Sequence, residues 1–67
     1  MYQGLVMAIA FQICAEVVIH ETDEYTTAFH FKREEGVTEF INELEAYAHK
    51  LSLTRIGLDV LVNFVED

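Results

Sequence analysis

The stretch that decides the fold of this 67-residue chain is GVTEFINELEAYAHKL, residues 36–51. Its apolar residues recur at intervals of three and four, which is the spacing of one face of an α-helix. These residues are Val37, Phe40, Ile41, Leu44, Tyr47, Ala48 and Leu51. Acidic residues crowd the first turns and Lys50 lies in the last, as the helix dipole favours. We therefore predict an amphipathic helix over residues 37–51, with Gly36 or Thr38 as its N-terminal cap.

Two alternating segments precede this helix. Large apolar residues occupy every second position from Met7 to Ile19, and the same pattern runs from Tyr25 to Lys32. Such alternation predicts two β-strands, and the short polar joint between them predicts a hairpin. Because the odd-numbered apolar residues of both strands must share a face, odd residues must pair with odd residues. The expected loop is therefore three residues long, either 21–23 or 22–24.

Alternation returns after the helix, from Ile56 to Phe64, and predicts a third strand. The whole chain, residues 1–67, is then a single compact α+β domain of the order β-β-α-β, since so short a chain builds only one core. We expect a three-stranded, mainly antiparallel sheet of strand order 2-1-3, with the one helix packed on one face.

The sheet face opposite the helix is expected to be uncovered. A three-stranded sheet with one helix is marginally stable alone, and exposed apolar residues often mark a contact with another chain. The sequence therefore predicts a homodimer whose interface contains Val18, Ala28, Leu61 and Val65. The alternative is a monomer with ordinary scattered apolar residues on its surface.

One pair of residues could carry chemistry. In the two favoured hairpin registers, His30 faces either Cys14 or Glu16, and Asp59 and Asn63 project from a neighbouring strand on the same face. A histidine beside a thiol can activate it as a nucleophile. A flat sheet, however, offers neither a pocket nor oxyanion donors. We therefore expect no enzyme and no catalytic residues, and the absence of ligand spacing predicts no metal and no cofactor.

Charge and composition narrow the class of protein. Twelve acidic residues against four basic ones give a net charge of −8, which argues against direct binding to nucleic acid or to an anionic membrane. The apolar run 5–15 is about half of the ~20 residues that a membrane span needs, and no basic residue precedes it as in a secretory signal. A single cysteine forms no internal disulfide. The expected location is the cytoplasm.

The acidic residues are the most distinctive feature of the sequence. They are expected in two groups, one at the hairpin tip and one reaching from the second strand onto the outer side of the helix. The first group is Glu21, Asp23 and Glu24, and the second is Glu34, Glu35, Glu39 and Glu43. Glu39 and Glu43 are like charges four residues apart, which slightly destabilises a helix. We interpret both groups as a partner-binding surface; the alternative is that they only keep an apolar chain soluble.

Two functions fit this interpretation. The first is a non-catalytic inhibitor or adaptor that docks on a basic, nucleic-acid-handling protein and mimics nucleic acid, like phage anti-CRISPR or anti-restriction proteins. That comparison rests on charge and size alone. The second is a small homodimeric structural or assembly subunit whose acidity is only solubilising.

Overall fold

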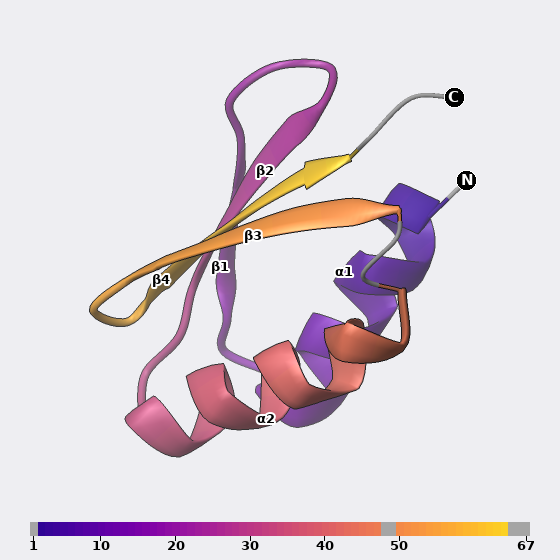
Figure 1. Ribbon diagram of the computed structural model, residues 1–67. Coiled ribbons are helices and arrows are strands. Elements are labelled where there is room, and N and C mark those ends of the chain that lie inside the picture. Colours follow the sequence, from indigo (N-terminus) through magenta and orange to yellow (C-terminus); the bar gives the residue numbers. More distant parts are fainter. Residues whose placement is uncertain (1, 48–49, 65–67) are drawn as a thin grey trace.

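The computed structural model of the chain describes residues 2–47 and 50–64 (Figure 1). The elements in order are α1 (Tyr2–Ile13), β1 (Val18–Glu21), β2 (Thr26–His30), α2 (Glu34–Leu44), a 3₁₀ turn η1 (Glu45–Tyr47), β3 (Leu51–Ile56) and β4 (Asp59–Phe64). The strands form one antiparallel sheet in the order β1-β2-β4-β3. Both helices lie on the same side of this sheet (Figure 1). The predicted α+β class is confirmed, but the prediction of three strands with one helix is wrong in detail.

Helix α1 is the largest departure from the sequence prediction. Residues 2–13 are helical, so the predicted first strand begins only at Val18. The segment is rich in Ala, Met, Leu and Gln, which are good helix formers. Val6 and Ala10, four residues apart, are fully buried and form the inner stripe of the helix. Apolar residues lie on all sides of α1. Its large and small side chains therefore alternate along the sequence as in a strand, although the segment is a helix.

The hairpin of β1 and β2 keeps the predicted parity but not the predicted register. Val18 pairs with His30 and Ile19 with Phe29, so odd residues do face odd residues. Each residue of β1 pairs with a residue further along β2 than a loop of residues 21–23 or 22–24 allows. The amide of Tyr25 donates a hydrogen bond to Oδ1 of Asp23 (2.8 Å), which holds the tip of the hairpin in a local turn.

The predicted third strand is the second half of another hairpin, β3 and β4. Ile56 pairs with Asp59, which leaves Gly57 and Leu58 as a two-residue turn. Gly57 has a φ of 62°, and no other residue in the described part of the chain has a positive φ. This is the φ pattern of a type II′ turn, which needs glycine at its first central position. The predicted strand order 2-1-3 is wrong, because β1 lies at an edge of the sheet and β4 pairs with β2 and not with β1.

Helix α2 confirms the predicted amphipathic stripe over a shorter range. It begins at Glu34 with Arg33 as its N-cap, so neither Gly36 nor Thr38 caps it. Val37, Phe40 and Leu44 are buried as predicted. The rest of the predicted stripe leaves the α-helix, because residues 45–47 form η1 and Leu51 begins β3. Ala48 lies outside the described residues.

The core lies between the helices and one face of the sheet. Phe40 of α2 is its centre: the Phe40 ring lies 5.0 Å from the ring centroids of both Phe29 and Phe31, at tilted angles. The fully buried sheet residues beneath α2 are Thr27, Phe29, Val60 and Val62. Because α2 is held to the sheet on this side, its opposite side faces solvent.

The start of α2 offers a test of the fold, because its N-cap residue provides no side-chain cap. Arg33 has the extended backbone of an N-cap (φ −139°, ψ 152°) but its side chain makes no capping hydrogen bond. We expect Arg33→Ser to stabilise the protein by about 1 kcal/mol, because serine can accept a hydrogen bond from an unpaired amide of the first turn. Urea unfolding followed by circular dichroism measures the gain. Lys32→Ser removes the same charge outside the cap and should leave stability unchanged within ~0.5 kcal/mol.

Candidate functional site

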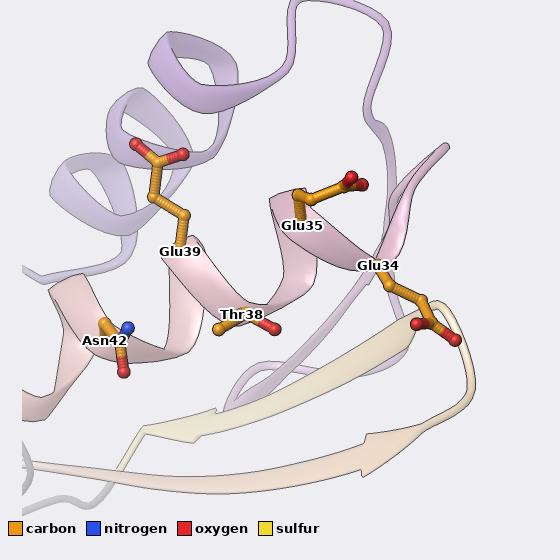
Figure 2. A pocket seen from close by; sticks show the side chains of 5 residues that line it. All are labelled: Glu34, Glu35, Thr38, Glu39 and Asn42. Carbon is orange, nitrogen blue, oxygen red and sulfur yellow. The ribbon is translucent and has the colours of Figure 1, made fainter.

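The solvent-facing side of α2 is the candidate site. We call it the acidic helix face and define it as Glu34, Glu35, Thr38, Glu39, Asn42 and Glu43, all of which are exposed. Figure 2 shows the first five of these side chains projecting from α2 around a shallow hollow of about 490 Å³. The helical period places them together, because residues three, four and seven apart share a side of the helix.

The charge of this face is not neutralised within the described structure. From Glu34 to Glu45 the sequence has five glutamates and no basic residue. Among the residues that the structure describes, none of the four glutamates of the face forms an ion pair with another described residue; His30 and Asp59, which do pair, lie elsewhere. The acidic helix face therefore presents carboxylates that are available to the ammonium or guanidinium groups of another molecule.

Local structure explains some of the predicted acidic residues but not all. Glu34 and Glu35 lie in the first turn of α2, where negative charge stabilises the helix dipole. Asp23 accepts the hydrogen bond that shapes the hairpin tip. Glu39 and Glu43 have no such role in the described structure, and their mutual repulsion opposes the helix. These two are the residues of the face that the fold does not need.

The structure does not bring all seven predicted partner-binding residues together. Glu21 ends β1, and Asp23 and Glu24 belong to the hairpin tip, at the opposite end of β2 from α2 (Figure 1). The remaining four lie on the acidic helix face. The two groups are therefore separate surfaces, and one flat partner surface would not contact both.

A second hollow, of about 300 Å³, adjoins the acidic helix face where the end of α1 meets the start of α2. Its lining includes Cys14, Phe31, Lys32, Arg33, Glu35 and Glu39. The sequence did not reveal this hollow, because it depends on the packing of α1, which was predicted to be a strand. Glu35 and Glu39 line both hollows, and in the second hollow they are accompanied by the basic Lys32 and Arg33.

The predicted pairing of His30 with Cys14 or Glu16 is wrong. Both lie in the bend between α1 and β1, and the residue opposite His30 in β1 is Val18. On the other side of β2, His30 pairs with Asp59, and the His30 Nδ1 lies 2.5 Å from the Asp59 Oδ1. Both side chains are about half exposed on the open sheet face, 48% and 50%. Among the described residues no group of three or more His, Cys, Asp or Glu side chains could hold a metal ion.

The predicted dimer-interface residues lie on the sheet face that the helices leave open. Val18 is 39% exposed, and Ala28 pairs with Leu61 across the centre of the sheet, where both are half-buried. Val65 lies outside the described residues. The same face also carries the polar residues His20, His30, Asp59 and Asn63, the last three as the sequence predicted. A contact with another chain through this face stays a prediction.

Comparison of the chain with protein-family models, with curated proteins and with solved structures found no match. In the part of the chain that the structure describes, no helix combines the length and the apolarity that crossing a membrane requires.

Proposed function

We propose that this protein is a non-catalytic interaction module whose acidic helix face docks on a basic surface of another protein, as an inhibitor or adaptor. The observation that carries the proposal is the row Glu35, Glu39 and Glu43, exposed and unpaired among the described residues. A surface selected for folding alone would not repeat like charges every four residues along one helix. Docking on cations converts that internal repulsion into favourable intermolecular attraction.

The density of charge favours a partner that handles nucleic acid. Four glutamates between Glu34 and Glu43 span about 14 Å of helix, or one charge per about 4 Å. A single strand of duplex DNA carries one phosphate per about 3.4 Å along the axis. The acidic helix face therefore has a comparable average density of negative charge along its axis, although the row Glu35, Glu39 and Glu43 itself repeats about every 6 Å. This density supports a nucleic-acid mimic of the phage anti-CRISPR or anti-restriction type.

The proposal is tested by capture at low salt. The immobilised chain should retain basic, nucleic-acid-binding proteins from a host lysate, identified by mass spectrometry, and should release them as the salt concentration rises, since screening weakens exposed charge pairs. Duplex DNA should compete with the chain for the retained protein. Retention that is unaffected by both salt and DNA would contradict the proposal.

The second function, a homodimeric structural subunit, is favoured by a different observation. Leu5 and Phe11 on α1 are 39% and 50% exposed, in a segment without charge. Both residues lie on the same exposed side of α1, and an exposed apolar surface can mark a contact with another chain.

A further inference from the structure

The outer side of α1 is an uncharged surface on a strongly acidic protein. Residues 2–15 contain none of the twelve acidic or four basic residues of the chain. Within α1, among residues 4–13, whose side chains the structure describes, the exposed positions fall on one side, within an arc of about 120° at 100° per residue, opposite the buried Val6 and Ala10. These positions are Gly4, Leu5, Ala8, Phe11 and Gln12, which we call the α1 outer face.

We propose that the α1 outer face is the interface of a symmetric homodimer in which two α1 helices pack antiparallel, with Ala8 at the two-fold axis. This inference deepens the second proposed function, the homodimeric subunit, and rests on it; it does not depend on docking through the acidic helix face. It also moves the dimer contact from the sheet face, where the sequence predicted it, to α1.

The distribution of charge favours a second copy of this chain as the occupant. With a net charge of −8, two copies repel each other wherever their acidic surfaces approach. The α1 outer face is free of that repulsion, and it carries no charge that would select a charged partner. An isologous contact places the same neutral apolar surface on both sides, which satisfies this requirement from one sequence. The open sheet face is less suitable, because Asp59 lies on it.

The sizes of the side chains complement one another in this arrangement. With the axis at Ala8, Phe11 of the second copy lies over Gly4, and Leu5 lies against the methylene groups of Gln12 of the second copy. A Cβ added at Gly4 would meet nothing within 4 Å, so the space above it is open to a large ring. Ala8 at the centre lets the two backbones approach closely, and antiparallel helices align their dipoles favourably.

The size of the contact sets the expected affinity. A helix of 12 residues is about 18 Å long, so the interface is at the small end of specific interfaces. Self-association should therefore be weak, with a micromolar dissociation constant. Higher salt should strengthen it, because salt screens the repulsion between two negatively charged copies. This salt dependence is opposite in sign to that expected for docking through the acidic helix face.

Sedimentation equilibrium over a range of concentrations tests the interface. We expect wild-type protein to dimerise and Phe11→Glu to weaken dimerisation at least ~10-fold, because two half-exposed rings are replaced by two charges in the contact. Val18→Asp, a matched charge insertion on the open sheet face, should dimerise like wild type. Circular dichroism verifies that both variants fold. A wild-type monomer at all concentrations, or loss of the dimer in Val18→Asp alone, would overturn the proposal.

Cysteine cross-linking tests the register even if Phe11→Glu fails to fold. In a Cys14→Ser background, Ala8→Cys should form an intermolecular disulfide under mild oxidation, because Ala8 meets its own copy at the axis. Gln12→Cys alone should not form one, because two copies of residue 12 lie at opposite ends of the contact. Equal cross-linking of both variants, or of neither, would contradict the antiparallel arrangement.

Discussion

Phe40→Ala should cost about 3–5 kcal/mol of stability, a large share of the total for a domain of this size. The Phe40 side chain is fully buried and its ring lies 5.0 Å from both Phe29 and Phe31. Its removal opens a cavity between α2 and the sheet, where the surrounding strands can collapse only partially. A domain of 67 residues has a total stability of about 3–10 kcal/mol, so this one ring accounts for much of it.

Urea unfolding followed by circular dichroism measures this loss, with Phe11→Ala as the matched control. Phe11→Ala deletes the same ring from a site that is 50% exposed, and at low protein concentration it should cost less than ~1 kcal/mol. If the two variants lost equal stability, the packing of Phe40 at the centre of the core would be wrong.

Helix α2 could be predicted from the sequence because burial on one side and solvent on the other give its residues a clear period. Val37, Phe40 and Leu44 point inward and Glu39 and Glu43 outward, as the spacing requires. The exposure of the acidic helix face was therefore also predictable. Its start was misplaced, because Arg33 caps the helix with backbone geometry alone and leaves no side-chain signal.

Helix α1 could not be predicted in the same way, since apolar residues occur on both its inner and its outer side. Without polar contrast, the alternation of large Ile9 and Phe11 with small Ala8 and Ala10 resembles a strand. This error changed the rest of the predicted fold. A strand in place of α1 formed the centre of the predicted sheet, so Leu51–Ile56 was not predicted to be a strand, although it forms β3. The hollow beside Cys14 was missed for the same reason.

The hairpin of β3 and β4 did have a sequence signal. Gly57-Leu58 is a two-residue Gly-X turn between two alternating segments, Leu51–Ile56 and Asp59–Phe64. Such a turn typically joins antiparallel neighbours. The signal was weak because Gly57 also fits within a continuous alternating strand, where glycine is merely unfavourable.

Charge reversal at Glu39 should have opposite effects on folding and on function. In the wild-type helix, Glu39 lies four residues from both Glu35 and Glu43, so two like-charge pairs oppose the helix. Lysine at this position creates two opposite-charge pairs instead, each worth about 0.2–0.5 kcal/mol. We therefore expect Glu39→Lys to stabilise the protein by about 1 kcal/mol, a gain of several degrees in Tm for a chain of this size.

The same substitution should weaken docking on the basic protein retained at low salt. Glu39 lines both hollows of the candidate site, so lysine introduces a repulsive charge at the centre of the contact. The expected loss is at least ~10-fold in Kd, seen mainly as slower association at low salt. Isothermal titration calorimetry and stopped-flow mixing measure the two quantities on a variant that is more stable than wild type, so unfolding cannot explain the loss.

The matched control for location is Glu24→Lys, which makes the same change in net charge at the hairpin tip. Glu24 is exposed and lies at the far end of β2 from α2, so its reversal should change the Kd by less than ~3-fold. Equal losses in the two variants would mean that overall charge governs binding and that the acidic helix face has no special part. Wild-type binding by Glu39→Lys would reject the face altogether, and the repulsion along α2 would then have no functional explanation.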